Sequence, residues 1–351
     1  MKQSRLFAAG SSAIKVLGAG AIFLALQAHA DYSKHPAGIK LINNMVSTYG
    51  ADKARITHLL ANAKKQQSIL DLIARPAEKT KPWFEYRKIF LGQKRIDKGV
   101  NFWKKHQKAL DAASEKYGVP QEIIVAIIGV ETRYGGYMGS HRVIDALATL
   151  GFDYPKRAPF FVKELEHFLL LTQEQKQDPL ALKGSYAGAM GFGQFMPSSY
   201  RAYAVDFDDD GKADIWTNPT DAIGSVANYF RAHRWQTGEP VMAKAIASDT
   251  ADQKVLDSRK RPSLLLEKAI SKGYTLENAR IDGKAIALDT KVLPLAYDIA
   301  SGKEYWLGFD NFYVITRYNR SHMYARAVWE LSQEIKSAYA SAYTHNTQTK
   351  K

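Results

Sequence analysis

The chain contains no cysteine among its 351 residues. This absence excludes disulfide bonds, thiolate metal sites and cysteine nucleophiles, and it also excludes a lipid attached to a cysteine behind an export signal. The nine histidines show neither an HExxH motif nor another zinc-ligand spacing, and no GxSxG motif marks a serine nucleophile. Catalytic chemistry must therefore come from carboxylates, hydroxyls, amides and backbone groups.

Long hydrophobic runs are also missing, apart from one near the N-terminus. Residues 1–30 hold three cations, then the apolar segment GAGAIFLALQ, then Ala-His-Ala before Asp31. This order is typical of a secretory signal peptide, and the apolar part is short for a membrane span. We expect cleavage between Ala30 and Asp31 and a soluble, exported product. The alternative is an uncleaved membrane anchor.

Basic residues outnumber acidic ones, 49 against 35, so the formal net charge is +14. Loss of the three cations of the predicted signal peptide would leave +11. An exported basic protein suggests an acidic polymer or surface as a partner. Nucleic acid is not expected, because no helix-turn-helix or RNA-binding signature accompanies the charge. The cations are also scattered among acids, which is equally typical of ordinary solvated faces.

Apolar residues recur at three-to-four spacing through much of the chain, which predicts helices. We expect residues 31–118 to form a helical lobe, joined by a last helix over 325–343. Short β-prone runs such as KVLPLAYD and EYWLGF, separated by turn residues, predict a small antiparallel β lobe over 256–313. The polar residues 344–351 are expected to form a disordered tail. The predicted fold class is α+β, mainly α.

The strongest functional signal is PQEIIVAIIGVETRYGG, residues 120–136. As a helix it places Ile124, Ile127, Ile128 and Glu131 on one face, because residues three and four apart are neighbours. Burial disfavours the ionised form of a carboxyl, so Glu131 can keep a proton near neutral pH and act as a general acid. The alternative is a solvated glutamate in a last helical turn. The all-apolar helix, the two glycines that end it and the flanking tyrosines favour a cleft wall.

A glycine-rich segment follows at residues 183–195, KGSYAGAMGFGQF. Its glycines are so frequent that the backbone must approach another helix or a ligand closely. The segment lacks the GK[ST] ending of a phosphate loop and does not follow a predicted strand. The segment is therefore not a phosphate loop, and a helix and a ligand both stay open as what it approaches.

The sequence DFDDDG is typical of the opening of a calcium-binding EF-hand loop. Asp206, Asp208 and Asp210 alternate before a glycine that permits the sharp turn around the ion. The acid expected at position twelve is missing, and the nearest later one is Asp221. We expect calcium here; the alternative is an acidic surface turn.

One acid, glycine-rich backbone and many aromatic residues suit a sugar polymer, because sugar rings have apolar faces and polar edges. The aromatic candidates are Tyr86, Tyr134, Tyr137, Tyr186, Phe195, Tyr229, Tyr318 and Tyr324. Glycoside hydrolysis ordinarily uses two carboxylates. Asp145 and Asp153 are the nearest candidates for a second, but neither has a context as buried as that of Glu131. A one-acid site needs either a held water or a group of the substrate as its nucleophile.

Four long segments occur in a distinctive order: IGVETRYGGYMGSHRVIDALATLGFDYPKRAPFF, GSYAGAMGFGQFMPSSYRAYAVDFDDDG, DAIGSVANYF and ITRYNRSHMYA. Together they resemble the membrane-bound lytic murein transglycosylase B family over most of the chain after residue 30. The resemblance implies a lysozyme-like catalytic core over 119–255, completed by 314–324. It also implies the reaction, which cleaves the MurNAc–GlcNAc β-1,4 bond of peptidoglycan without water and leaves a 1,6-anhydro-MurNAc end.

The resemblance also implies roles for particular residues. Glu131 matches the acid that protonates the leaving oxygen and then, as a carboxylate, takes the proton of the C6 hydroxyl, while the N-acetyl group of the substrate stabilises the intermediate. Ser185 matches a residue that holds this acid in place. The implied sugar contacts are Gln194, Phe195, Tyr86, Tyr229, Tyr318, Asn319 and Tyr324. Lys156 and Arg157 match a basic pair that faces the peptide stem, although exposed loop charge explains them about equally well.

For the EF-hand-like loop, residues 206–221, the resemblance implies structural Ca²⁺ and no organic cofactor. The matching ligands are Asp206, Asp208, Asp210, the carbonyl of Lys212, and Asp221 as the closing acid. The segment TNPTD is one residue longer than the family pattern, which leaves the closing ligand open.

The expected partners are peptidoglycan glycan strands with their peptide stems and other cell-wall enzymes. Many relatives are lipoproteins, but this chain has no cysteine to lipidate, so we expect a soluble periplasmic form. Two alternative functions stay open. A hydrolytic lysozyme-type muramidase would need a held water and a base, and a non-catalytic peptidoglycan-binding protein would keep the cleft without turnover.

Overall fold

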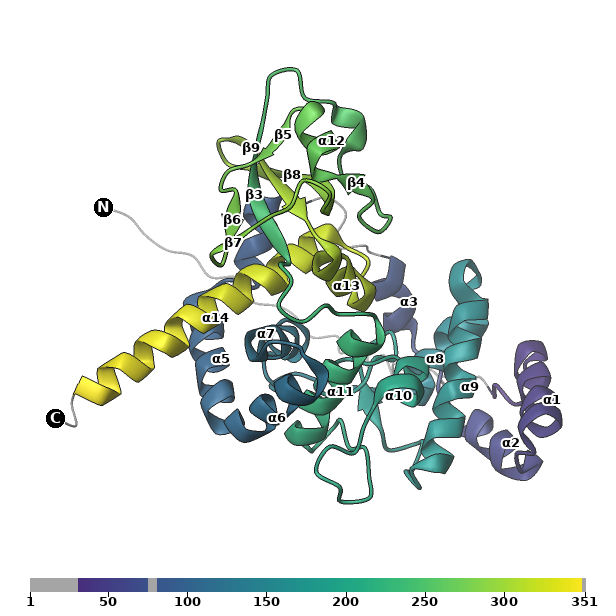
Figure 1. Cartoon of the computed structure of the whole chain (residues 1–351). Helices are drawn as coiled ribbons and strands as arrows, with labels where there is room; N and C mark the ends of the chain where they lie inside the picture. The colour runs from purple at the N-terminus through teal and green to yellow at the C-terminus, as the bar shows by residue number, and fades with distance from the viewer. Residues whose placement is uncertain (1–30, 75–80, 349–351) are drawn as a thin grey trace, which may run out of the picture.

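The computed structural model describes residues 31–74 and 81–348. The predicted signal peptide, residues 1–30, lies outside the described residues. A body of helices carries a small β lobe on one side, and the long helix α14 (His322–Gln348) runs along the junction (Figure 1). This arrangement confirms the predicted fold class, α+β and mainly α.

The helical body contains helices of very different lengths. In chain order they are α1 (Pro36–Tyr49), α2 (Lys53–Asn62), α3 (Gln67–Ala74), α4 (Trp83–Tyr86), η1 (Arg87–Ile89), α5 (Gln93–Lys105), α6 (Gln107–Tyr117), α7 (Gln121–Thr132), α8 (Val143–Asp153), η2 (Pro155–Arg157), α9 (Ala158–Glu174), α10 (Pro197–Tyr203), α11 (Pro219–Ala232) and α13 (Asp310–Tyr318). A short antiparallel ribbon pairs β1 (His141–Arg142) with β2 (Lys183–Gly184). This ribbon joins the segment after α7 to the glycine-rich segment.

Helix α7 is the centre of the body, and every residue from Glu122 to Val130 is buried. Helices α5, α6, α11 and α14 pack around it, which its nearly all-apolar sequence permits (Figure 1). Tyr134, just beyond the end of α7, donates a hydrogen bond to the Arg95 carbonyl of α5 at 3.0 Å. The tyrosine lies against Gly129, where a Cβ would come within 2.5 Å of the hydroxyl. Glycine is therefore needed there for the close approach.

Helices α1 to α3 do not form one lobe with α5 and α6, so the predicted helical lobe over 31–118 is divided. Helices α1 and α2 pack on each other, α1 contacts α9 and α3 contacts α8, while α5 and α6 lie at the opposite end of the body (Figure 1). Asp145 on α8 accepts a hydrogen bond from the Lys64 backbone N–H at 2.8 Å, which joins the loop between α2 and α3 to α8. Helical periodicity shows which face of a helix is buried but not which partner covers it.

The β lobe is a five-stranded antiparallel sheet in the order β4-β8-β9-β3-β5. Its strands are β3 (Met242–Ala247), β4 (Leu264–Leu265), β5 (Tyr274–Leu276), β8 (Lys291–Ile299) and β9 (Gly302–Gly308), accompanied by η3 (Gln253–Val255), α12 (Leu266–Ser271) and a ribbon of β6 (Arg280–Ile281) with β7 (Lys284–Ala285). The lobe therefore begins at Met242, before the predicted boundary at 256. The sequence of β3, MAKAIA, is rich in alanine, and alanine is depleted in strands, which explains the difference.

Helix α14 is longer than the predicted helix over 325–343. It continues through 344–348, where we expected a disordered tail, and residues 349–351 lie outside the described residues. Lys336 on α14 pairs with the buried Glu122 at the start of α7, with Nζ and Oε1 2.9 Å apart. No helix within 31–74 and 81–348 is long and apolar enough to cross a membrane.

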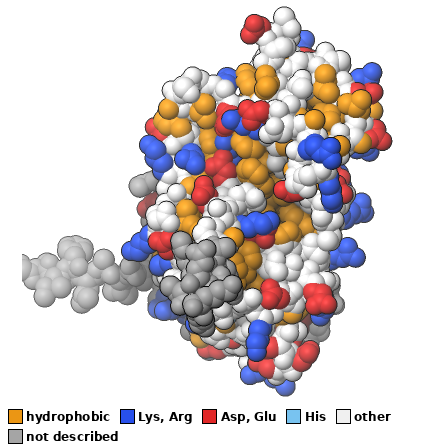
Figure 2. All heavy atoms as spheres, turned by 60° about the vertical axis from the view of Figure 1, so that its left-hand side comes forward, with side chains coloured by type: hydrophobic (Ala, Val, Ile, Leu, Met, Phe, Trp, Pro, Cys, Tyr) orange, Lys and Arg blue, Asp and Glu red, His pale blue; other side chains and the backbone are white. Residues whose placement is uncertain are grey.

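On the face seen in Figure 2 the positive charge is spread out rather than gathered into one patch. Figure 2 shows lysine and arginine side chains across one whole face, mixed with aspartate and glutamate, while apolar side chains gather toward the middle of that face. On this face the distribution agrees with the interpretation of most cations as solvated surface charge.

Candidate active site

Glu131 lies in the last turn of α7, and its half-buried carboxylate accepts a hydrogen bond from Tyr324 on α14. The Tyr324 hydroxyl is 2.5 Å from Glu131 Oε1. After Thr132 the chain turns sharply, because Arg133 and Tyr134 both have left-handed backbone, with φ of 55° and 63°. This conformation is strained for residues other than glycine, and such strain is concentrated at functional sites. The turn ends a rigid helix directly beside the carboxylate.

Two tyrosines lie close to this carboxylate. Burial, and then the charge of Glu131, raises the pKa of the Tyr324 phenol above its ordinary value. The same two causes raise the pKa of Tyr318. Both phenols therefore stay protonated around neutral pH; Tyr324 donates a hydrogen bond to Glu131, whereas Tyr318 donates one to the Gly193 carbonyl. A carboxylate that has just lost its proton is stabilised by donors of this kind.

The glycine-rich segment closes against the end of α7. Thr132 Oγ1 donates to the Phe192 carbonyl at 2.9 Å, and Gln194 Nε2 donates to the Met138 carbonyl at 3.2 Å. Gln194 also has left-handed backbone, with φ of 51°. On the other side, the Tyr318 hydroxyl donates to a carbonyl of the same segment at 2.6 Å. The segment is thus held between α7 and α13, next to Glu131.

Glycine permits the close contact between this segment and the loop after α7. Gly139 has φ of 94°, and a Cβ there would lie 2.0 Å from the carbonyl oxygen of Gly184. Ser185 follows, and its Oγ accepts hydrogen bonds from two backbone N–H groups of its own loop at 3.0 and 3.3 Å. A hydroxyl that accepts two bonds still has its own proton to donate. Ser185 therefore offers a donor beside the loop that follows Glu131.

Asp145 and Asp153, the candidates for a second acid, stabilise the fold elsewhere. Asp145 is 3% exposed and pairs with Arg142, with Oδ1 and Nη2 2.6 Å apart. Asp153 accepts hydrogen bonds from the Tyr32 hydroxyl at 2.5 Å and from Lys65 Nζ at 2.8 Å. Both carboxylates therefore form hydrogen bonds and ion pairs that hold α8 to the neighbouring segments.

Four carboxylates converge in the loop between α10 and α11. Asp206, Asp208, Asp210 and Asp221 each offer an oxygen atom within 4.8 Å of the others. Asp221 is fully buried at the start of α11 and accepts the Phe207 backbone N–H at 2.7 Å. Burial, and the nearby charges of Asp208 and Asp206, raise the pKa of Asp221. The extra residue in TNPTD therefore does not remove the predicted closing acid from the cluster.

This donor set fits a hard divalent cation, because Ca²⁺ prefers carboxylate and carbonyl oxygens. The loop backbone curls around Asp206, whose carboxylate accepts hydrogen bonds from the backbone N–H groups of Asp210 and Gly211 at 3.1 and 2.7 Å. Gly211 has φ of 91°, which favours glycine. Lys212, whose carbonyl is a predicted ligand, lies on the same turn and donates its N–H to Asp210 at 2.9 Å. A cation there would offset the repulsion among four acids.

A family model described as a transglycosylase SLT domain matches residues 34–333. This match includes α7 with Glu131, the glycine-rich segment, the acidic loop and the β lobe. The chain belongs to the transglycosylase SLT family.

Relatives are similar to the chain along nearly its whole length. Membrane-bound lytic murein transglycosylase B of Escherichia coli (strain K12) is 43% identical over 319 residues, which are 88% of this chain and 85% of the relative. The crystal structure of soluble lytic transglycosylase SltB1 from Pseudomonas aeruginosa is 51% identical with a TM-score of 0.81, covering 87% of this chain and 100% of that chain. The chain is accordingly a lytic murein transglycosylase with a lysozyme-like fold, an enzyme that acts on peptidoglycan.

Two further solved structures of similar proteins contain ligands. Escherichia coli Slt35 in complex with calcium is 42% identical with a TM-score of 0.79, covering 89% of this chain and 96% of that chain. Pseudomonas aeruginosa SltB3 in complex with NAG-anhNAM-pentapeptide is 28% identical with a TM-score of 0.73, covering 85% of this chain and 78% of that chain.

Four of the sugar contacts expected for this transglycosylase are buried; one of them, Tyr324, is 3% exposed and donates to Glu131. Tyr86, Phe195 and Tyr229 are 1%, 3% and 7% exposed. The Phe195 ring lies 5.8 Å from that of Tyr229 and 6.0 Å from that of Tyr318. The structure favours packing beneath the site over direct sugar contact for these three rings. Gln194, Tyr318 and Asn319 are only half-buried and stay available to a ligand.

The basic pair Lys156 and Arg157 is exposed in η2, between α8 and α9. The Arg157 guanidinium lies over the Phe160 ring, 4.4 Å from its centroid. The rings that Arg157 contacts, Phe160 and Phe161, belong to α9. The structure therefore brings Glu131, Gln194, Tyr318 and Tyr324 together but does not join the basic pair to them.

Sequence reasoning missed the parts played by Thr132 and Met138. The Thr132 hydroxyl joins α7 to the glycine-rich segment, and the Met138 carbonyl receives the Gln194 amide. Their nearness to Glu131 in the chain was the one available signal, because a hydrogen bond to a backbone carbonyl leaves no pattern in the side chains.

Proposed function

We propose that this transglycosylase cleaves the MurNAc–GlcNAc β-1,4 bond without adding water and leaves a 1,6-anhydro-MurNAc end, with Glu131 as its catalytic residue. The observation that carries the proposal is one carboxylate at the end of a buried helix, 2.5 Å from a tyrosine hydroxyl. The nearest candidates for a second acid, Asp145 and Asp153, are engaged in structural contacts. In this proposal the nucleophile is a group of the substrate rather than a held water.

The proposed reaction has two proton transfers through Glu131. In the first, the protonated carboxyl gives its proton to the glycosidic oxygen while the bond from that oxygen to C1 of MurNAc breaks. The N-acetyl group of MurNAc stabilises the charge at C1. In the second, the carboxylate takes the proton of the C6 hydroxyl, whose oxygen forms the new bond to C1. Glu131 ends protonated, as it began.

The neighbours of Glu131 are proposed to stabilise its ionised form between the two steps. Tyr324 donates directly to the carboxylate, and Ser185 offers a further hydroxyl proton from the adjacent loop. Preorganised donors of this kind lower the energy of charged intermediates without having to reorient. Gln194, Tyr318 and Asn319 are proposed to contact the sugar edges, since each is half-buried beside the acid or on α13 and the turn that follows it.

The proposed substrate is a glycan strand that carries peptide stems. The complex of SltB3 with NAG-anhNAM-pentapeptide supports both the anhydro sugar end and the presence of a peptide. Lys156 and Arg157 remain proposed stem contacts, on the resemblance alone.

We also propose that the loop between α10 and α11 binds Ca²⁺ in a structural role. The four converging carboxylates and the calcium complex of Slt35 support this assignment. Asp206, Asp208, Asp210 and Asp221 would hold the ion, with the Lys212 carbonyl. Helix α11 packs on α7, so a firmly held loop also supports the helix that carries Glu131.

The proposed location is the periplasm, after removal of residues 1–30. The order of cations, apolar segment and Ala-His-Ala supports an export signal. N-terminal sequencing of the protein from a periplasmic extract should give Asp31 as the first residue. An intact N-terminus in the membrane fraction would contradict the proposal.

Replacing Glu131 by glutamine tests the catalytic assignment. The amide keeps the shape of the side chain but cannot donate a proton, so Glu131→Gln should lower the release of muropeptides from purified peptidoglycan by at least about a thousandfold. Binding to insoluble peptidoglycan, measured by co-sedimentation, should persist. Activity within tenfold of the unchanged enzyme, with an unchanged melting temperature, would refute the assignment.

A further inference from the structure

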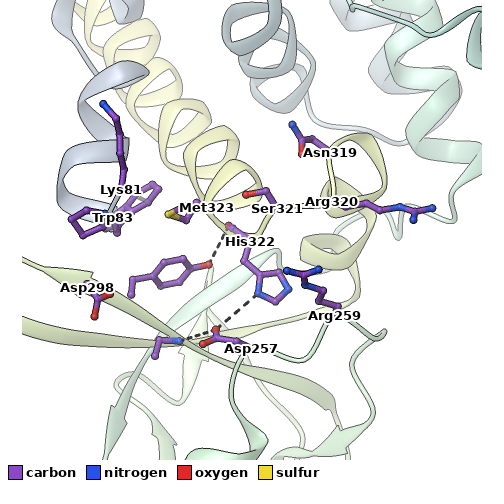
Figure 3. Close-up of a pocket in the computed structure, with 13 residues that line it drawn as sticks. Lys81, Trp83, Asp257, Arg259, Asp298, Asn319, Arg320, Ser321, His322 and Met323 are labelled. Atoms are coloured by element: carbon purple, nitrogen blue, oxygen red, sulfur yellow. Dashed lines mark hydrogen bonds and ion pairs between the residues drawn. The ribbon is translucent and has the colours of Figure 1, made fainter. Parts of the chain in front are cut away.

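A cavity of about 570 Å³ lies between the β lobe and the start of α14 (Figure 3). Four parts of the chain line it: residues 81–83 at the start of α4, the loop after η3, strand β8, and the turn 319–323 between α13 and α14. Asn319, a proposed sugar contact, lies on its wall. The cavity is large enough for several polar groups of a ligand and is not used by the proposed bond cleavage.

The cations of this cavity form no ion pair within the part of the chain that the structure describes. Lys81, Arg259 and Arg320 line it, and none of them forms an ion pair with any residue in 31–74 or 81–348. Figure 3 shows Arg259 beside the ring of His322, and Arg320 extending from the turn before α14. Both arginines are exposed, so their guanidinium groups are available to a ligand.

One of the two acids of the same cavity is paired with a cation. Asp298 pairs with Lys303, with Oδ1 and Nζ 2.8 Å apart. Asp257 accepts the Ala296 backbone N–H at 3.2 Å and lies 3.9 Å from the imidazole of His322. The cavity therefore holds three cations against the single carboxylate of Asp257, which leaves an excess of positive charge.

His322 is affected by this charge. Burial, and then the charges of Arg259 and Arg317, lowers the pKa of its imidazole to about 4. The ring is therefore uncharged at neutral pH, and the positive charge available to a ligand comes from the arginines and Lys81. A positive cavity of this kind attracts an anion.

The cavity adjoins the active site through the turn between α13 and α14. Asn319 follows Tyr318, whose pKa is raised in part by the charge of Glu131. Asn319, on the cavity wall, is therefore one peptide unit, about 3.8 Å between Cα atoms, from the tyrosine that feels the charge of Glu131. An anionic group carried by the substrate can thus enter the cavity while the sugar lies at Glu131.

We propose that this cavity binds a carboxylate of the peptide stem of peptidoglycan, with Arg259 and Arg320 as its main contacts. The inference rests on the proposed peptidoglycan substrate. A stem of five residues spans at most roughly 17 Å and ends in a carboxylate, so it reaches from a sugar at Glu131 into the neighbouring cavity. A guanidinium presents paired N–H donors that match the two oxygens of a carboxylate. This site is separate from Lys156 and Arg157, which lie in η2.

The test compares two substrates that differ only in their stems: intact peptidoglycan strands, and strands from which an amidase has removed the peptides. The unchanged enzyme should have a lower KM for the strands with stems. Arg259→Ala combined with Arg320→Ala should raise that KM by about five- to tenfold and leave the KM for bare strands unchanged. Replacement of both arginines by lysine should restore part of the preference, since charge returns without the paired donors. The preference should also weaken as salt is added.

Two matched variants control for charge alone. Lys40→Ala with Lys53→Ala removes two exposed cations from α1 and α2, at the far end of the body, and should keep the full preference. Lys94→Ala with Lys98→Ala removes two cations from a different basic hollow, which α5 lines with Arg133. It should keep the preference as well.

Several results would overturn the inference. The first is that the double alanine variant of Arg259 and Arg320 still has a lower KM for strands with stems. The second is that its KM rises equally on both substrates. The third is that either control variant loses the lower KM for strands with stems. Failure of the proposed function is a different result, because the unchanged enzyme would then release no anhydro product from either substrate.

Discussion

Glu131 depends closely on one neighbour, the Tyr324 hydroxyl. The two groups come from α7 and α14, and their 2.5 Å contact places a donor at the carboxylate. Tyr324 is itself 3% exposed, so its hydroxyl has little access to water. A donor fixed in this way stabilises the ionised carboxylate more than the neutral acid. The pair should therefore determine the pH range in which Glu131 can exchange its proton with the sugar.

Tyr324→Phe removes this donor while it keeps the ring. We expect kcat to fall by about 10- to 100-fold, because one preorganised donor to a charged intermediate is lost. Without the hydroxyl the ionised carboxylate is less stable, so Glu131 keeps its proton to higher pH and the alkaline limb of the pH–rate curve should move upward. Measurement of kcat across the pH range checks both effects.

Tyr137→Phe is the matched control for Tyr324→Phe. It removes a hydroxyl from a nearby tyrosine that is 67% exposed, and it should leave both kcat and the pH–rate curve close to those of the unchanged enzyme. An unchanged alkaline limb in Tyr324→Phe would show that the hydroxyl does not act on Glu131.

At the scale of elements, helices α7 and α8 carry carboxylates with different roles. Helix α7 carries Glu131, the proposed catalytic acid, in its last turn, whereas α8 carries Asp145 and Asp153, which join it to residues 31–74. The structural acids are surrounded by cations and donors from the protein itself. The difference explains how a chain rich in carboxylates can have a site with one acid.

Asp145→Ala should destabilise the fold without changing the chemistry. The change leaves the Arg142 guanidinium and the Lys64 N–H without their acceptor, which should cost about 2–4 kcal/mol in the free energy of unfolding. Urea unfolding measures the loss, and kcat below the transition should stay within about twofold. A fall in kcat as large as that of Glu131→Gln, with stability unchanged, would make Asp145 a second catalytic acid.

The elements show what the sequence could and could not predict. The buried helix that carries Glu131, the glycine-rich segment and the acids Asp206, Asp208 and Asp210 were predicted from local periodicity or spacing, whereas Asp221 as the closing acid was implied only by the family resemblance. Strand β3 was missed because its alanine-rich sequence has weak strand preference. The division of residues 31–118 between two ends of the body was missed because helix partners depend on packing between distant segments. The predicted sugar contacts Phe195 and Tyr229 carried no signal that separates a ring on a cleft wall from one beneath it.

At the scale of the whole molecule, the charge of the acidic loop affects the stability of the fold. Four carboxylates within 4.8 Å repel one another, and a divalent cation that binds only the folded state stabilises it by mass action. The loop lies between α10 and α11, and α11 packs on α7. Calcium should therefore raise the stability of the body that holds Glu131.

Calcium at about 100 times its dissociation constant should add about 2.7 kcal/mol to the free energy of unfolding. The melting temperature should rise with calcium and fall with a chelator, and Mg²⁺ should have a smaller effect because it requires a tighter octahedral shell. Asp208→Asn with Asp210→Asn should remove the response. A melting temperature that is the same with chelator and with calcium would exclude the metal site.

The central claim, that the substrate rather than water supplies the nucleophile, has one direct measurement. Purified peptidoglycan is digested by the enzyme in water enriched in ¹⁸O, and the released muropeptides are weighed by mass spectrometry. The account predicts products that are lighter by one water than hydrolysed ones and carry no ¹⁸O at the MurNAc end. Products of full hydrolysed mass with ¹⁸O at that end would contradict it and identify a hydrolytic muramidase.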